Sequence, residues 1–548
     1  MRPSTSRALL VLAFSATLSA CSSSESPPPP EPEPFVYDGP WTPLPEEGEW
    51  RDRGSFAPCS EAEAGRAIGL CNETLPPNPA ACDLASLAGL ETRGAVYRAE
   101  IRVETTLQKP SGPEPYYRPE EGGFRFDATG TLVSVKGLQA FSAYLDQMFY
   151  VAGYIPAGFA EPQYAFIGCR ASSPRELTGC ISACGNGQLR YFGSFRAQRM
   201  TWRQGEAESS GGLQLLSESF VELGKPGDVF VAKDHAYVVS YDRPGRRGGL
   251  TVFDVSDRRH PVLKTSFNIP GDSYWNGVWA KGDALYVASD ARGVLVFDIS
   301  SPAEPRFVRN VPGSTQDGVH TVSVDGDRLY ATALRSDAML MFDVSSPLEP
   351  RLLTRFKLPS EPRDASLGPA RQTYPHDAFA YQGRLYINYL SDGFAVVDVS
   401  ALPDTTLLGR YNYPYAFSHT NAVGTFNGRT IAFEGGETTG AHLRVLDVTD
   451  PAHIVKVGEY TLRDLTSIHN MVLRGTRLYV AWYHEGVRVL DVSDPSKPRE
   501  LAYFNTYRES DARREDQLYE GAIGMRVPGD GYVYVVDTAR GLLIFEEL

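Results

Sequence analysis

The sequence predicts an all-β protein, a seven-bladed β-propeller closed by an N-terminal strand and preceded by a small disulfide-tied β-rich domain. Two observations support this prediction. A short motif around one acidic residue recurs seven times between residues 250 and 547. Of the seven cysteines, all ahead of the repeats, six lie in two groups at 59–82 and 169–184. We expect a signal peptide (1–20), a stalk (21–34), the disulfide-tied domain (35–212) and the propeller (213–548).

The N-terminus has the pattern of an export signal. Two arginines precede an apolar run at 8–18, which is too short to span a bilayer. The run ends in "LSAC" (18–21), which resembles the lipobox of bacterial lipoproteins. This resemblance implies that Cys21 is lipidated, and that Ser22 directs the protein to the outer membrane, facing the periplasm or the cell surface. Plain secretion with a chance cysteine is the alternative.

A Ser/Pro-rich stretch follows at 22–34. Proline favours the extended polyproline II conformation, and serine and proline cannot build a core. We therefore expect a semi-rigid stalk between the anchor and the folded body.

The remaining cysteines predict disulfides. An even number of cysteines in an exported chain favours three bridges, and a zinc site lacks CxxC pairs and a nearby histidine. Because each group holds an odd number, at least one bridge must join the two groups, although the connectivity stays open. The six residues are Cys59, Cys71, Cys82, Cys169, Cys180 and Cys184.

Three segments of this domain, at 96–107, 122–137 and 188–203, alternate polar and apolar residues. Alternation predicts β-strands with one solvated face. The segment at 138–155 fits either a short helix or another strand pair.

The repeat is represented by "GVLVFDIS" at 293–300. Successive acidic positions are 44 to 55 residues apart, which is the range of propeller blades. Each unit holds four runs rich in Val, Tyr and Phe joined by glycine-containing turns, which predicts four antiparallel strands. The third run is apolar at successive positions, as expected for a strand buried on both faces. The acidic positions are Asp254, Asp298, Asp343, Asp398, Asp447, Asp491 and Glu546.

The seventh unit ends at Leu548, directly after its third strand. Residues 215–223 match the fourth strand of the first blade, at 262–269. We expect this N-terminal strand to pair with the C-terminal strand, because ring closure hides two exposed sheet edges.

The repeats, with the pattern L-x-V-x-D-V-S-x-P, resemble the LVIVD-repeat family of bacterial surface β-propellers over roughly 213–548. The resemblance implies the fold and says little about activity, because propellers host binding proteins and enzymes alike.

The repeated aspartate is interpreted as structural. It stands where the third strand ends and a "DVS" or "DIS" turn begins, where a carboxylate accepts backbone N–H groups in an Asx turn. A catalytic carboxylate would be needed once, whereas this one occurs in every blade.

The start of each innermost strand is the better place for a site. Counting ten residues back from the second-strand tyrosine, or its equivalent, brings histidines to one mouth of the central channel. Imidazoles are suitable ligands for Zn, Cu, Ni or Fe, so a metal ion is one possible cofactor. Asn at equivalent positions favours the other interpretation, that these side chains hydrogen-bond channel water. The candidate metal ligands are His320, His376, His419 and His469, and the candidate ligand-binding residues are Asn276, Asp317, Asp377, Asn421 and Asn470.

The two longest insertions, 359–377 and 505–521, lead into the same mouth and are predicted to form a lid or a partner-binding rim. The net charge of −14 provides no basic patch for nucleic acid. No nucleophile elbow, phosphate loop, HExxH or dinucleotide fingerprint is present.

Two functions remain. The first is a non-enzymatic, surface-anchored lipoprotein whose propeller binds a protein, a peptide or a glycan. The second is an exported metal-dependent enzyme, an oxidase or a hydrolase, that uses the histidine-lined mouth.

Overall fold

The structure, a computed structural model, describes residues 35–59, 81–109, 112–144, 149–154, 164–185, 188–313, 316–362, 364, 367–368 and 372–548. The predicted signal peptide, Cys21, the stalk and Cys71 lie outside these ranges. In the described residues, no helix combines the length and apolarity needed to cross a membrane.

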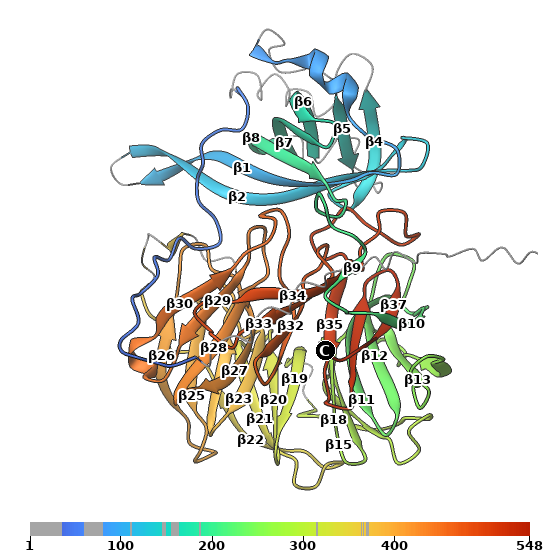
Figure 1. Cartoon of the computed structure of the whole chain (residues 1–548), viewed down its shortest axis with the longest axis vertical. Coiled ribbons are helices and arrows are strands. Elements are labelled where there is room, and N and C mark those ends of the chain that lie inside the picture. The colour runs from blue at the N-terminus through green and yellow to red at the C-terminus, as the bar shows by residue number, and fades with distance from the viewer. Residues whose placement is uncertain are drawn as a thin grey trace, which may run out of the picture. The chain divides into compact units, whose positions relative to one another are not determined.

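The N-terminal domain is a closed antiparallel barrel of eight strands (Figure 1). The strands pair in chain order, and β8 returns to pair with β1. The segment at 138–155 therefore contains a strand pair, β4 and β5. The strands are β1 (Val96–Lys109), β2 (Gly112–Phe126), β3 (Leu132–Val135), β4 (Leu138–Tyr144), β5 (Tyr150–Tyr154), β6 (Tyr164–Ser173), β7 (Glu176–Gly185) and β8 (Gln188–Arg199), with a short 3-10 helix, η2 (Leu84–Gly89), before them.

Aromatic side chains fill the barrel core. Phe124 lies in ring contact with Tyr97, Phe149 and Phe166, with centroids 5.2 to 5.6 Å apart. All four side chains are buried. The alternation seen in the sequence thus places one face of each strand in this core and the other face outward.

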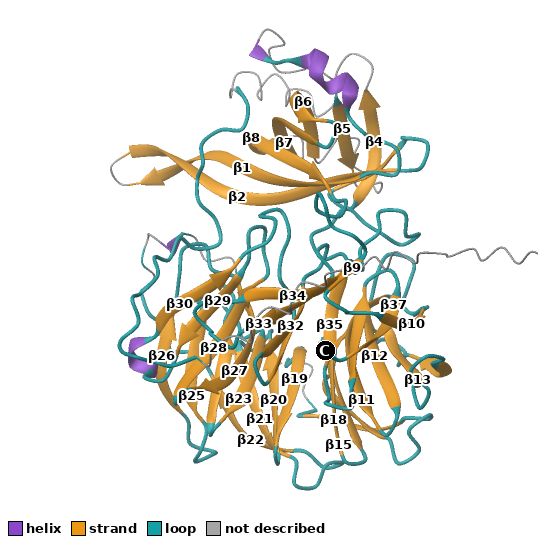
Figure 2. Ribbon diagram, in the orientation of Figure 1, coloured by secondary structure: helices purple, strands orange, loops and turns teal. Residues whose placement is uncertain are grey.

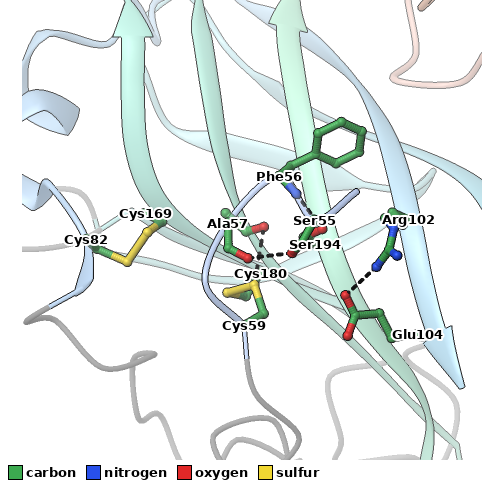
Figure 3. The surroundings of a disulfide bond; sticks show 11 residues. Ser55, Phe56, Ala57, Cys59, Cys82, Arg102, Glu104, Cys169, Cys180 and Ser194 are labelled. Atoms are coloured by element: carbon green, nitrogen blue, oxygen red, sulfur yellow. Dashed lines mark hydrogen bonds and ion pairs between the residues drawn. A yellow bond between two sulfur atoms is a disulfide. The ribbon is translucent and has the colours of Figure 1, made fainter. Parts of the chain in front are cut away.

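Two disulfides tie the barrel to the segment before it, as predicted (Figure 3). Cys59 bonds to Cys180 and Cys82 bonds to Cys169, so both bridges join the two cysteine groups. Cys184 is also disulfide-bonded. Next to the first bridge, the Phe56 amide donates to Ser194 Oγ at 2.9 Å (Figure 3).

The seven-bladed propeller is confirmed as seven separate antiparallel sheets (Figures 1 and 2). In blades one to six, the four strands follow in chain order within each sheet. Blades one to three are β11 (Lys225–Ala232), β12 (His235–Tyr241), β13 (Gly249–Asp254) and β14 (Val262–Phe267); β15 (Trp275–Lys281), β16 (Ala284–Ser289), β17 (Gly293–Asp298) and β18 (Arg306–Val311); and β19 (Val319–Asp325), β20 (Arg328–Ala333), β21 (Ala338–Asp343) and β22 (Arg351–Phe356). Blades four and five are β23 (Asp377–Tyr381), β24 (Arg384–Asn388), β25 (Phe394–Asp398) and β26 (Thr406–Tyr411); and β27 (Ser418–Phe426), β28 (Arg429–Gly436), β29 (Leu443–Asp447), the short 3-10 helix η4 (Pro451–His453) and β30 (Val455–Tyr460).

Blade seven closes the ring as predicted. It consists of β35 (Ala522–Arg526), β36 (Tyr532–Asp537), β37 (Gly541–Glu546) and the N-terminal strand β10 (Leu215–Ser219), which pairs with β37. Blade six has a fifth strand that the repeat did not predict, because two residues ahead of β10 pair with its outer edge. Its strands are β31 (Met471–Arg474), β32 (Arg477–Ala481), β33 (Val487–Asp491), β34 (Arg499–Phe504) and β9 (Ser209–Ser210).

The third strands show why the motif repeats. In β17 the first five residues are buried on both faces, which explains the unbroken apolar run. Asp298 Oδ1 then accepts the Ser300 amide at 2.8 Å, and its Oδ2 accepts Arg306 at 3.0 Å. The Asx turn recurs in the other blades where the motif ends in aspartate, with the residue two positions on as donor, at Asp254, Asp343, Asp398, Asp447 and Asp491.

The insertion at 505–521 is bound by the barrel. The Asp516 carboxylate accepts the Gly137 amide at 2.7 Å and the Ser134 hydroxyl at 3.0 Å, and its backbone carbonyl accepts Arg98 at 2.7 Å. Arg199 pairs with Glu509 at 2.8 Å. These residues were predicted to form a lid or a partner-binding rim, and the structure shows them in contact with the protein's own N-terminal domain. The insertion at 359–377 is described only in part.

The segment before the barrel packs on blade five. Glu49 accepts a hydrogen bond from Arg444 at 2.7 Å, and both side chains are fully buried. The Leu44 amide donates to the Lys456 carbonyl at 3.0 Å. This part of the chain therefore contacts the propeller before it enters the barrel.

Candidate metal site in the propeller channel

The first strands of the blades surround a cavity of about 530 Å³. Its lining includes His376, His419 and His469, which stand at or just ahead of β23, β27 and β31. The inner strands position these side chains because each blade begins its first strand at the same mouth of the channel.

Four imidazoles form a continuous row at this mouth. The ring centroids of His320 and His376 are 4.3 Å apart, those of His376 and His419 are 4.1 Å apart, and those of His419 and His469 are 4.4 Å apart. The histidines come from four consecutive blades, three, four, five and six. Counting from the second strands therefore located side chains that are adjacent in space.

Burial keeps these rings uncharged. It lowers the pKa of His320 to about 4 and that of His469 to about 3. The pKa values of His376 and His419 fall well below the ordinary value, because burial and the neighbouring imidazoles both disfavour a positive charge. A neutral imidazole has a free lone pair, which is the form that binds a metal ion.

Glu437 is the residue that the sequence did not reveal. It follows β28 of blade five, and its Oε2 lies 3.4 Å from His419 Nε2 while its Oε1 lies 3.5 Å from His469 Nε2. Burial raises the pKa of Glu437 to about 8. These contacts are therefore close approaches between neutral groups, and we do not count them as ion pairs. A nearby divalent cation would favour the carboxylate form of Glu437.

Tyr483 holds Glu437 in place. Its hydroxyl donates to Glu437 Oε1, and its ring centroid is 4.9 Å from that of His469. Tyr483 has a φ of 30°, a left-handed conformation that is unusual for a residue with a side chain. The Ala522 amide donates to the Tyr483 carbonyl at 3.1 Å and fixes this turn.

Hydrogen bonds divide the four histidines into two kinds. His469 Nδ1 donates to the Ile523 carbonyl at 2.8 Å, which leaves Nε2 with a free lone pair directed at Glu437. Asn276 Nδ2 donates to His320 Nε2 at 3.0 Å, so this lone pair of His320 is already used. His320 thus belongs to the row of rings but does not join the donor set below.

One donor set is compact enough for a metal ion. A nitrogen of His376, a nitrogen of His419 and an oxygen of Glu437 all lie within 4.8 Å of one another. Both ring nitrogens of His419 and Nδ1 of His376 are buried without a hydrogen-bond partner in the described part of the chain. Unpartnered buried polar atoms cost free energy, and an ion bonded at about 2.1 Å to each donor would satisfy one nitrogen of each imidazole after a small inward movement of the side chains. Two imidazoles and one carboxylate suit divalent first-row transition metals.

The other predicted residues lie in different places. Asp377, Asn421 and Asn470 line the channel, and burial raises the pKa of Asp377 to about 6. Asn421 Nδ2 donates to Asn388 Oδ1 at 2.6 Å. The carboxylate of Asp317 instead accepts two hydrogen bonds from Arg355, at 2.6 and 2.8 Å, so it does not join the channel site.

Fold and site together define a seven-bladed β-propeller with a donor set for a cation at one mouth of its channel. Four segments match the model of the LVIVD repeat, at 223–269, 273–312, 380–413 and 469–506. The chain therefore contains LVIVD repeats, in agreement with the resemblance seen in the sequence. No curated protein sequence matches the chain.

Two solved structures are similar to this chain at low sequence identity. The crystal structure of the WD40 β-propeller domain of Doa1 is 10% identical, with a TM-score of 0.45, and the match covers 62% of this chain and 98% of that one. The computationally designed Ika8 protein is 9% identical, with a TM-score of 0.39, and the match covers 71% of this chain and 94% of that one. Neither likeness bears on the site.

Proposed function

We propose that the protein is an exported binding protein whose propeller channel holds a divalent first-row transition-metal ion. The observation that carries this proposal is the donor set of His376, His419 and Glu437, in which both ring nitrogens of His419 are buried with no hydrogen-bond partner among the described residues. His469 Nε2 borders this donor set, 3.5 Å from the other oxygen of Glu437. When bound, the ion provides Lewis acidity and an anchoring point for an oxygen or nitrogen atom of a ligand.

The metal site is tested by titration of the chelator-stripped mature protein with Zn²⁺, Ni²⁺ and Cu²⁺. We expect one ion per chain by calorimetry and elemental analysis, and at least a tenfold loss of affinity in His419→Ala and in Glu437→Gln. A His260→Ala/His453→Ala double variant is the matched control, because both of these side chains are 81% exposed. Absence of a stoichiometric ion, or equal affinity in the site variants and the control, would contradict the proposal.

The same proposal places the protein outside the cytoplasm, attached through a lipid on Cys21. The lipobox-like sequence supports the anchor, and disulfides such as Cys59–Cys180 and Cys82–Cys169 are typical of oxidising compartments. A Cys21→Ser variant should move from the membrane fraction to the soluble fraction and lose incorporation of labelled palmitate. Unchanged fractionation and labelling would argue against lipidation at this residue.

The size of the channel favours a small ligand over a large partner. A cavity of about 530 Å³ lies within the range of small-molecule pockets, about 300–1,000 Å³, and is too small for a folded protein. Binding of a protein, peptide or glycan at another surface stays a prediction. The second candidate function, a metal-dependent oxidase or hydrolase, is favoured by the same cavity, because it gives a substrate access to the donor set.

A further inference from the structure

The channel changes character along its length. On β23, Asp377 and Phe379 are both partly exposed while Ala378 between them is buried. Alternate residues of a strand point the same way, so Asp377 and Phe379 both face the channel, and Phe379 lies about 7 Å further from the histidines. The histidine end of the cavity is therefore polar, and its other end begins with an aromatic ring.

Other inner strands extend this division. Asn470 lines the cavity next to His469, and Val472 lines it two residues further along the chain. Trp279 and Phe230 also line the cavity, with ring centroids 5.0 Å apart. The half away from the histidines thus offers apolar and aromatic walls to a ligand, with Ser323, Asp325 and Arg526 as its polar members.

Charge limits the kind of ligand. Arg526 is the single cation among the described lining residues. It lies over the Trp279 ring at 5.0 Å and donates to Asp228 Oδ2 at 2.9 Å. The wall itself therefore offers an anionic head group no unpaired cation, and Asp377 opposes the attraction that the metal ion exerts on an anion. A protonated amine would be repelled by a metal ion at the head of the channel.

A neutral hydroxyl group on an aromatic ring suits both halves of the channel. Its oxygen can approach the metal ion, and its O–H can donate to Asp377, which an acceptor-only group cannot do. The attached ring would then lie beside Phe379 and Trp279, where aromatic contacts add to the gain from burial.

We propose that the channel binds a small, neutral aromatic molecule bearing one or two hydroxyl groups, a phenol or a catechol, with its oxygen at the metal end and its ring in the apolar half. This inference rests on the proposed metal site and deepens it by naming the class of ligand. It assigns ligand contacts to Asp377, Phe379 and Trp279.

The test uses 4-nitrocatechol as the probe, at a pH low enough that both of its hydroxyl groups are protonated in free solution; its visible absorption then responds to bonding with a metal ion. The mature protein is loaded with one Zn²⁺ and freed of excess ion by dialysis. We expect one probe per chain, with an absorption change that is absent in the zinc-free protein. Phe379→Ala should weaken probe binding at least tenfold and leave Zn²⁺ affinity unchanged. Phe307→Ala is the matched control, because this phenylalanine lies on β18 and is 41% exposed.

The two proposals fail in different ways. If Zn²⁺ binds stoichiometrically but the probe does not, or if Phe379→Ala and Phe307→Ala bind the probe equally, the ligand inference is wrong and the metal site stands. Equal probe binding with and without Zn²⁺ also overturns the inference, because the oxygen would then not lie at the ion. If Zn²⁺ does not bind, both proposals are wrong.

Discussion

The third strands and the first strands of the blades follow opposite rules. Each third strand is an apolar run with an acidic residue at its end, and the same Asx turn recurs from blade one to blade six. The first strands begin differently in each blade, with histidine in some and Asn276 or Gly227 in others. A feature shared by every blade meets a need that every blade has, which is packing and turn formation. A feature found in only some blades marks the place where the ring departs from symmetry and can bind a ligand.

The largest expected effect is loss of a third-strand core residue. Phe297 on β17 is fully buried, and its ring lies 5.9 Å from that of Trp275 and 5.8 Å from that of Phe267. Phe297→Ala should lower the free energy of unfolding by about 3–5 kcal/mol, because it leaves a cavity between blades. Chemical denaturation followed by fluorescence measures this change. A loss below about 1 kcal/mol would show that the third strands are not the principal packing layer.

Replacement of a residue of the metal site should instead raise the free energy of unfolding when no metal is bound. His419→Phe removes two unpartnered buried nitrogens, so in the absence of metal it should raise the free energy of unfolding by about 1 kcal/mol. The same variant should lose metal binding. Thermal unfolding of both proteins in the presence of a chelator provides the comparison. A variant that is clearly less stable than the parent would place His419 with the scaffold rather than with the site.

Loss of an aspartate that forms an Asx turn should lower the free energy of unfolding by less than loss of Phe297 does. Asp491 Oδ1 accepts the Ser493 amide at 2.8 Å, and its Oδ2 accepts Arg499 at 2.6 Å. Asp491→Ala should cost about 1 kcal/mol, and Asp491→Asn should cost less because the amide oxygen can keep the turn. Metal affinity should be unchanged in both variants. Equal destabilisation by Ala and Asn would show that the ion pair with Arg499, and not the turn, is what matters.

The smallest expected effect is the loss of folding stability at low pH. Hydrogen bonds from Ser300 and Arg306 lower the pKa of Asp298 to about 2, and those from Ser345 and Arg351 do the same for Asp343. Because the pKa is lower in the folded state than in the unfolded state, this stabilisation is present above about pH 4 and is lost as the pH falls toward 2. Unfolding midpoints measured between pH 5 and pH 2 should fall, and the Asp298→Asn/Asp343→Asn variant should show a shallower fall. An identical slope in parent and variant would contradict this origin.

The propeller could be predicted because each blade is encoded by a short sequence pattern that recurs along the chain. The motif around Asp298 gave the number of blades, and the resemblance of 215–223 to 262–269 revealed the strand that closes the ring. The barrel was predicted only as strands. Its closure depends on pairing between β1 and β8, about 90 residues apart, and alternation within a strand carries no information about its partner.

The site was predictable only in part, for the same reason. His376 and His469 occupy corresponding positions in their blades, and His419 lies two residues before the corresponding position, Asn421, so counting placed them together. Glu437 directly follows a second strand, in "FEGGE", but Asp242 and Asp290 also directly follow the second strands of blades one and two, so this position did not single it out. The one available signal was a charged residue following a buried strand. Asp317 stood beside the histidines in sequence, yet its position gave no indication that Arg355 would bind it.

Periodicity and residue number, which are written along the chain, were sufficient to predict the class of fold, the seven blades, the closing strand and at least one bridge between the two cysteine groups. Tertiary structure decided which groups meet. It brought Glu437 and Tyr483 to the histidines, paired Arg355 with Asp317, and bound the insertion at 505–521 to the barrel. These contacts join residues from different strands, blades or domains, and their partners are chosen by three-dimensional packing and by the cost of leaving buried polar groups unpaired.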